Sequence, residues 1–319
     1  MALVHPPSTK PIAEHVHLPS SIMEMLRRPE PINPPAWIRM GGEIRSETLA
    51  VPHRGGKLHR DVHFFVPNAN HLSKRGKGNI PLLIAYHGST EHGLLFRAST
   101  SSYAYDELAC EEGFIVAYPD GNWNDGRVKA VFPASLENVD DLSFTKAVID
   151  HAAKHLGTSQ KRTLLVGFSN GGNLLLRMLY EPLAPPIAGI ALHCASLPEQ
   201  ENSTVLFNPS EKSRVPVILI HGTADPVNPY EGGNSVLVRL AHGKALGDRG
   251  LHMGCLRTAR HLARNWGSEN EVIEYPGKLS PSLVVDDWIR QEDEDALRPV
   301  VRLVSLVGEG HHISVPGGS

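Results

Sequence analysis

The chain has 319 residues, of which 41% are hydrophobic and 20% charged, and its formal net charge is −3. This composition is typical of a globular protein with a buried core, and the small charge gives no reason to expect a nucleic acid or an anionic membrane as a partner. No stretch approaches the roughly 18 consecutive apolar residues that span a bilayer, and the first residues show no secretory signal pattern. We therefore expect a cytoplasmic protein, of an oligomeric state that the sequence leaves open.

The chain divides into a proline-rich arm, residues 1–45, and one large domain, residues 46–319. Short apolar runs recur through the domain, and several are continuous rather than alternating, as in parallel strands that are covered on both faces. The predicted strands are 61–67, 80–88, 113–121, 162–169, 187–196, 215–225, 271–277 and 300–310. The acidic, proline-flanked segment 279–299 is predicted to be an insertion or a long connection.

Helical patterns separate the predicted strands. Apolar residues recur at helical spacing in 140–157, where Gly157 is placed to end the helix, and helices are also predicted at 171–180 and 255–267. Alternating strands and helices predict an α/β protein with a mostly parallel central sheet and helices on both faces.

The segment "GFSNG" places Ser169 between an apolar strand and a helix, with glycine two residues before it and two residues after it. A serine on so tight a turn projects clear of the backbone, and Gly167 and Gly171 avoid collisions with the adjacent strand and helix. The start of the helix favours negative charge, so we expect the backbone N–H of Asn170 to be one oxyanion donor.

A serine nucleophile needs a histidine base and an acid that orients the histidine. In this arrangement the acid and then the histidine follow the serine along the chain, each after a strand. Asp225 follows the run "VILIHGTAD", and His311 and His312 follow the last strand. We predict Asp225 as the acid, with an Asx turn before Pro226 as the alternative. His311 is favoured as the base because it comes first after the glycines, and His312 remains open.

A second oxyanion donor normally comes from the loop after an early central strand, and Ser89 N–H in "YHGSTEHG" is the candidate, while His87 is expected to brace the loop. The segment "NWNDGR" has two interpretations. Either Trp123 lines the substrate site and Arg127 braces the loop through Asp125, or these side chains pack locally. Further candidates for substrate binding are Tyr103, in the segment 90–110, and His312.

The 18 histidines invite a metal hypothesis, because His151 and His155 lie four residues apart on a predicted helix. The segment "HAAKH" lacks the glutamate of an H-E-x-x-H zinc motif, and a solvated helix face is the favoured interpretation. No glycine-rich phosphate-binding loop is present. The three cysteines form no CxxC pair, and we expect free thiols.

The segments "PLLIAYHGSTEHG", "AYPDGNWNDGR", "VDDLSF", "GFSNGGNLLLRM", "ILIHGTADPVNPYEGG" and "GEGHH" occur in this order. Over residues 57–316 the chain thereby resembles the branch of the α/β-hydrolase fold that holds polyhydroxybutyrate depolymerases, feruloyl esterases and acetylxylan esterases. The resemblance implies a serine esterase with Ser169, Asp225 and His311 as triad, and no metal or organic cofactor. Such relatives are commonly secreted and often have an aromatic residue after the histidine, whereas Ile313 stands near that position here.

The leading hypothesis is a serine carboxylic ester hydrolase that forms an acyl-enzyme with a small or medium ester. A hydroxyalkanoate, an aryl or feruloyl-type ester and an acylated metabolite are the substrates considered. One alternative is an acyltransferase or lactone-forming enzyme with the same triad. Another alternative is a ligand-binding protein that turns over slowly or not at all, since a fold does not establish an activity.

Overall fold

The computed structural model describes residues 41–72, 76, 78–130, 132–182, 185–208, 214–239, 245–267, 272–290 and 299–313. Most of the predicted arm, residues 1–40, lies outside the described residues, and so do residues 291–298 of the predicted insertion. The last residues assigned to the arm, 42–45, belong to the first strand, which begins at Gly42.

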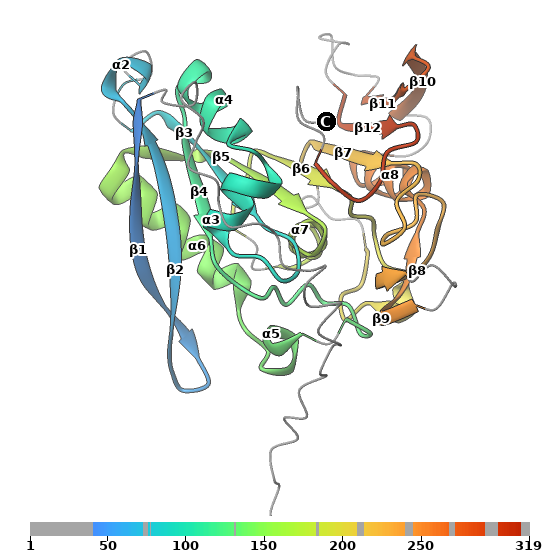
Figure 1. The fold of residues 1–319 in the computed structure, drawn as a ribbon, viewed down its shortest axis with the longest axis horizontal. Coiled ribbons are helices and arrows are strands. Elements are labelled where there is room, and N and C mark those ends of the chain that lie inside the picture. Colours follow the sequence, from blue (N-terminus) through green and yellow to red (C-terminus); the bar gives the residue numbers. More distant parts are fainter. Residues whose placement is uncertain are drawn as a thin grey trace, which may run out of the picture.

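A ten-stranded sheet of order β1-β2-β4-β3-β5-β6-β7-β12-β11-β10 organises the described part of the chain (Figure 1). Its strands are β1 (Gly42–His53), β2 (Gly56–Pro67), β3 (Ile80–Tyr86), β4 (Ile115–Pro119), β5 (Thr158–Phe168), β6 (Gly189–His193), β7 (Val217–Gly222), β10 (Val272–Ser280), β11 (Leu283–Arg290) and β12 (Val301–Leu306).

The middle of the sheet is parallel and its borders are antiparallel. Strands β4, β3, β5, β6, β7 and β12 run parallel, with Leu83 paired to Leu164 and Leu219 paired to Leu303. Antiparallel β1 and β2 flank one side, and antiparallel β11 and β10 flank the other. The prediction of a mostly parallel central sheet is thus confirmed, and β11 occupies part of the segment 279–299.

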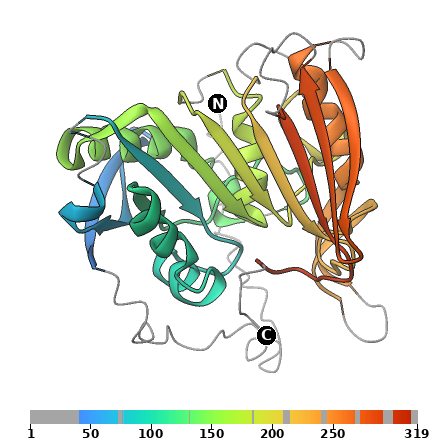
Figure 2. The ribbon, with the colours of Figure 1, turned by 90° about the horizontal axis from the view of Figure 1, so that it is seen from above.

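Helices cover both faces of the sheet. The described helices are α2 (Ala69–Leu72), α3 (Gly93–Leu95), α4 (Ala104–Glu112), α5 (Pro133–Leu136), α6 (Asp141–His151), α7 (Asn170–Met178) and α8 (Cys255–Ala263), with π-helical turns at Phe96–Thr100 and Ala152–Leu156 and 3-10 turns at Gln200–Asn202 and Arg264–Trp266. Figure 2 shows the teal α3 and α4 segment on one side of the sheet and the green α6 and α7 on the other.

Two apolar clusters fill the spaces between the sheet and these helices. The larger cluster joins Leu82 and Leu165 of the sheet to apolar residues of α6, α7 and α8. The smaller cluster joins Val116 and Val166 to Phe96 and to residues of α4. Adjacent residues of one strand, such as Leu165 and Val166, therefore enter different clusters, as the alternation of side chains across a strand requires.

Local signals explain the limits of α6. The side chain of Asp140 accepts a hydrogen bond from Ser143 N at 2.9 Å, which satisfies one of the free N–H groups at the start of the helix. After the π-helical turn, the chain leaves the helix at Gly157 with φ of 74°. Glycine adopts this left-handed conformation without steric strain, and the predicted helix end is confirmed.

A separate two-stranded sheet, β8 (Gly232–Arg239) and β9 (Ala245–Met253), lies between β7 and α8 in the chain. The sequence patterns predicted neither strand, nor β1, because these segments carry no continuous apolar run. Within the described residues, no helix combines the length and apolar character needed to cross a bilayer.

The parallel arrangement determines where the candidate residues meet. Ser169 follows β5, Asp225 follows β7 and His311 follows β12. Since the carboxyl ends of parallel strands lie at one edge of a sheet, these three loops gather at the same edge.

Candidate active site

The turn at Ser169 is strained and tightly enclosed. Ser169 has φ of 53° and ψ of −113°, an unusual conformation for a residue with a side chain. A Cβ atom on Gly167 would lie 2.6 Å from the Gly171 carbonyl carbon, and a Cβ on Gly171 would lie 2.5 Å from Tyr86 O. A Cβ on Gly172 would lie 2.6 Å from the Cβ of Ala195. Each glycine is therefore required by the close approach of backbone or side-chain atoms.

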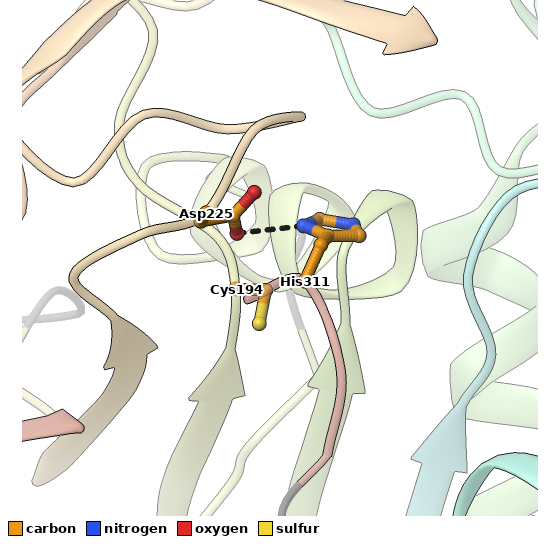
Figure 3. A group of neighbouring side chains, drawn as sticks. All are labelled: Cys194, Asp225 and His311. Atoms are coloured by element: carbon orange, nitrogen blue, oxygen red, sulfur yellow. Dashed lines mark hydrogen bonds and ion pairs between the residues drawn. The ribbon is translucent and has the colours of Figure 1, made fainter. Parts of the chain in front are cut away.

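His311 connects the serine to the aspartate. Its Nε2 lies 2.9 Å from Ser169 Oγ, and its Nδ1 lies 2.7 Å from Asp225 Oδ2. Figure 3 shows the imidazole ring turned edge-on toward the carboxylate, with Nδ1 on the near side. Because Nδ1 donates to the carboxylate, Nε2 is free to accept the proton of the Ser169 hydroxyl. The ring of Phe168 lies 5.2 Å from the imidazole, centroid to centroid.

His312 points elsewhere. Its Nε2 lies 2.9 Å from Glu309 Oε2, and half of its side chain is exposed. The structure thus brings His311, and not His312, into contact with both Ser169 and Asp225.

Asp225 is held by a dense set of donors. Its side chain is fully buried, and Oδ1 accepts the backbone N–H groups of Val227 at 2.8 Å and Asn228 at 2.9 Å. One oxygen thus forms the Asx-type turn of the alternative interpretation, while the other contacts His311, as the predicted acid would. Burial would raise the pKa of Asp225, but hydrogen bonds from His221 and His311 hold it well below its usual value.

His221 was not singled out in the sequence. It lies in β7 with 1% of its surface exposed, and its Nε2 is 3.2 Å from Asp225 Oδ2. The available signal was its place four residues before the aspartate in "HGTAD", at the end of a strand whose carboxyl end faces the site.

The loop after β3 is braced from within. His87 is buried, donates from Nδ1 to Gly88 O at 2.7 Å and accepts Gly121 N–H at Nε2 at 3.3 Å. Gly88 N donates to Glu91 Oε2 at 2.9 Å. Burial lowers the pKa of His87, which suits a neutral ring that donates at one nitrogen and accepts at the other. Ser89 follows these contacts and is partly exposed, and its role as an oxyanion donor stays a prediction.

The segment "NWNDGR" packs locally, which corrects the assignment of Trp123 to substrate binding. Trp123 is 0% exposed, so its ring offers no surface on which a ligand can stack. Its Nε1 donates to His87 O at 2.8 Å, and its ring contacts Tyr86 at 5.1 Å and His87 at 4.7 Å, centroid to centroid. Trp123 therefore supports the loop after β3 from behind.

Asp125 links the same segment to the turn at Ser169. Its Oδ2 accepts hydrogen bonds from Arg127 Nε at 2.9 Å and from Asn170 Nδ2 at 2.5 Å. All three residues are buried. Because Asn170 is the first residue of α7, this ion pair holds the start of the helix beside Ser169.

Tyr103 is also corrected as a substrate-binding candidate. Its surface is 4% exposed, and the guanidinium carbon of Arg97 lies 4.8 Å from its ring centroid. Arg97 in turn pairs with Asp106 at 2.6 Å. Tyr103 therefore packs into the base of α4 rather than facing a ligand, while the neighbouring Tyr105 places its hydroxyl 3.4 Å from His193 Nε2.

Cys194 is the one further polar neighbour of the pair Asp225 and His311 that Figure 3 draws. Its Sγ and the ligand atoms of the other two side chains lie within 4.8 Å of one another, a spacing that invites comparison with a metal site. The sulfur points away from the pair in Figure 3 and donates to His312 O at 3.4 Å, and burial raises the pKa of the thiol well above its usual value. A buried, protonated and already bonded thiol is a poor metal ligand, so we assign no metal to this group.

Known proteins share parts of this sequence and fold. The family model described as Phospholipase/Carboxylesterase matches residues 133–245, a range that contains Ser169 and Asp225. A bifunctional acetylxylan esterase/xylanase from Neocallimastix patriciarum is 29% identical over 173 residues, which cover 54% of this chain and 22% of that protein. Acyl-protein thioesterase 1 from Mycosarcoma maydis is 32% identical over 142 residues, which cover 40% of this chain and 58% of that protein. The chain thus spans less than two thirds of either relative.

A solved structure extends the likeness to the whole fold. The acetyl xylan esterase from Aspergillus awamori superimposes with a TM-score of 0.51 over 86% of this chain and 96% of that one, at 14% identity. The chain therefore has the α/β-hydrolase fold. Its mostly parallel sheet, with helices on both faces, is the α/β-hydrolase fold that the sequence predicted.

Proposed function

We propose that this α/β hydrolase is a serine carboxylic ester hydrolase that works through an acyl-enzyme. The observation that supports the proposal most directly is the chain of hydrogen bonds from Ser169 Oγ through His311 to Asp225 Oδ2, at 2.9 and 2.7 Å. The names of its relatives, an acetylxylan esterase and an acyl-protein thioesterase, agree with acyl transfer to water.

In the first half of the reaction, Ser169 Oγ attacks the ester carbonyl carbon while His311 Nε2 takes the hydroxyl proton. Asp225 keeps the proton of His311 on Nδ1 and stabilises the imidazolium that forms. His311 then gives its proton to the alkoxide, which leaves as the alcohol, and Ser169 keeps the acyl group. In the second half, water replaces the serine hydroxyl, and the same proton transfers release the acid.

The negative oxygen of the tetrahedral intermediate needs two N–H donors. We assign these to the backbone of Asn170, at the start of α7, and of Ser89, after β3. Asp125 supports the first donor through Asn170 Nδ2, and the contacts of His87 and Gly88 support the second. Both donors thereby belong to braced segments, as preorganised electrostatic stabilisation requires.

The proposed substrates are small or medium esters, such as acetyl or feruloyl-type esters, hydroxyalkanoate oligomers or thioesters of acylated metabolites.

The test is hydrolysis of p-nitrophenyl esters of increasing acyl length by the wild-type protein, Ser169→Ala and Ser159→Ala. Ser159 lies on the same strand at its opposite end, so its variant controls for the loss of a serine hydroxyl. We expect Ser169→Ala to lose at least about 10³-fold in kcat and Ser159→Ala to retain activity.

Intact-mass analysis after treatment with a fluorophosphonate completes the test. A single adduct on the wild-type protein that Ser169→Ala does not form supports the serine mechanism. An adduct at Ser169 without turnover of any ester would contradict hydrolysis and favour transfer to another acceptor. Failure to form an adduct would contradict the assignment of the nucleophile.

A further inference from the structure

The carboxylate of Asp225 serves two histidines. His221 Nε2 lies 2.8 Å from Asn228 O and 3.2 Å from Asp225 Oδ2. A carbonyl oxygen and an ionised carboxylate oxygen only accept hydrogen bonds, so Nε2 of His221 carries a proton and donates it to both. Both histidines therefore lie next to Asp225 Oδ2, His221 from within β7 and His311 from the loop after β12.

The two imidazole rings differ in their access to solvent. The His221 side chain is 1% exposed and that of His311 is 15% exposed, while Asp225 between them is fully buried. In so dry a place, each donor to Oδ2 has a strong effect on the charge that the other donor experiences. His221 is therefore placed to influence His311 through Asp225.

Several other groups face this pair. Cys255, the first residue of α8, and the ring of Tyr230, 6.0 Å from His221 between centroids, lie around the His221 ring, and His252 of β9 acts on its charge from farther away. Cys194 faces Asp225 from the end of β6. Burial disfavours a charged His221, but Cys255 and Asp225 outweigh it and raise the pKa of His221 to about 10. His221 therefore keeps a proton on Nε2 at neutral pH, as its contact with Asn228 O requires.

We propose that His221 is a positioning residue for Asp225, which holds Oδ2 in line with His311 and draws part of the carboxylate charge away from it. Without the contact between His221 and Asp225, His311 would hold its proton up to a higher pH. A hydrolase built in this way keeps its base neutral, and so active, in more acidic solution. This last consequence rests on the proposed function, whereas the sharing of Asp225 does not.

Two substitutions separate the donor from the bulk of the ring. His221→Phe keeps an aromatic ring of similar size and removes the N–H donor. His221→Gln places an amide N–H near the position of Nε2 and removes the titratable ring. His261→Gln, on α8, is the matched control, because His261 packs against Tyr180 and Phe207 and not against Asp225.

The primary measurement is nuclear magnetic resonance of the protein with ¹⁵N-labelled histidine rings, as a function of pH. The His311 signals are identified by their loss in His311→Gln. We expect His221→Phe to move the midpoint of proton uptake by His311 upward by about 0.5 to 1 pH unit. His221→Gln is expected to restore at least half of that shift, and His261→Gln to leave the midpoint unchanged.

The acid limb of kcat/KM for a p-nitrophenyl ester is expected to move by the same amount in the same direction. If no ester is hydrolysed, the proposed function fails, while the resonance titration still decides the role of His221. An unmoved His311 midpoint in a His221→Phe protein with native near-ultraviolet circular dichroism would overturn the proposal. Should His221→Phe not fold, His221→Asn replaces it, because its shorter amide cannot reach Oδ2, and an equal midpoint for Asn and Gln then overturns the proposal.

Discussion

The packing of Gly172 against Ala195 allows a double-mutant test of why the nucleophile turn needs glycine. Gly172 lies in the first turn of α7, where helix propensity alone favours alanine by about 1 kcal/mol. A Cβ on Gly172 would lie 2.6 Å from Ala195 Cβ, about 1 Å closer than the optimal contact between two carbon atoms. For Gly172→Ala, steric overlap therefore predicts a loss in the free energy of unfolding, and helix propensity predicts a gain.

We expect the steric overlap with Ala195 to outweigh the gain in helix propensity. Overpacking of a well-packed site costs about 1 to 3 kcal/mol, so Gly172→Ala should lower the free energy of unfolding in spite of its helix propensity. Ala195→Gly removes the atom in conflict, and the two substitutions should therefore couple favourably by at least about 1 kcal/mol. If α7 is displaced by about 1 Å, Ser169 and the proposed oxyanion donor at Asn170 also move, and kcat should fall by about 10²-fold in the single variant.

Urea unfolding of the four proteins of this cycle measures the coupling, and hydrolysis of a p-nitrophenyl ester measures kcat. Gly55→Ala is the control for a glycine without neighbours. A Cβ there meets nothing within 4 Å, but φ is +77°, so we expect a loss of about 1 to 2 kcal/mol in stability and no change in kcat. Additive effects of Gly172→Ala and Ala195→Gly, within about 0.5 kcal/mol, would refute the steric explanation.

Three further substitutions follow from the buried contacts. Asp125→Asn leaves the buried guanidinium of Arg127 without its charged partner and should lower the free energy of unfolding by about 3 to 5 kcal/mol. The control Asp150→Asn, in an exposed helical pair, should change the free energy of unfolding by less than about 1 kcal/mol. Equal effects of the two substitutions in urea unfolding would contradict the role of burial. Trp123→Phe leaves His87 O without its indole donor and should cost about 1 to 3 kcal/mol in stability at an unchanged KM, so a selective rise in KM would restore Trp123 to the substrate site. Burial, with a neighbouring arginine, lowers the pKa of His252 to about 3, so between about pH 6.5 and pH 3 the unfolded chain takes up a proton at His252 that the folded protein does not. The free energy of unfolding should therefore fall with falling pH by up to about 1.4 kcal/mol per pH unit. His252→Gln should flatten this slope, and an unchanged slope would contradict the low pKa of His252.

The backbone of the site could be predicted because it depends on local patterns. The order of Ser169, Asp225 and His311, each after an apolar run, places them at one edge of a parallel sheet once the strands are known to be parallel. Helix ends such as Gly157 are likewise local. The pattern "GFSNG" also predicted that a side chain at Gly167 or Gly171 would collide with the adjacent strand or helix, and the contacts around these glycines confirm it.

What the sequence did not predict depends on contacts between distant segments. Trp123 packs behind His87, a residue 36 positions away, and nothing in "NWNDGR" distinguishes a ring that faces a ligand from one that faces the core. His221, the second histidine that contacts Asp225, lies in the otherwise apolar strand β7, where the sequence shows it only as a single polar residue. The glycine-rich strands β8 and β9 lack the apolar alternation that marks a strand. The catalytic roles and the cytoplasmic location stay predictions.

The long sequence separations within the site have a consequence for the protein during its synthesis. Ser169 meets His311 across 142 positions, and Asp225 meets it across 86. Strand β12, which delivers His311, must pair with β7 after both earlier segments have left the ribosome. A nascent chain can therefore form the turns at Ser169 and Asp225 and still be inert, because the proposed base, His311, has not yet been translated. If the proposed mechanism holds, the growing polypeptide cannot hydrolyse esters, and activity begins only when the last parallel strand joins the sheet.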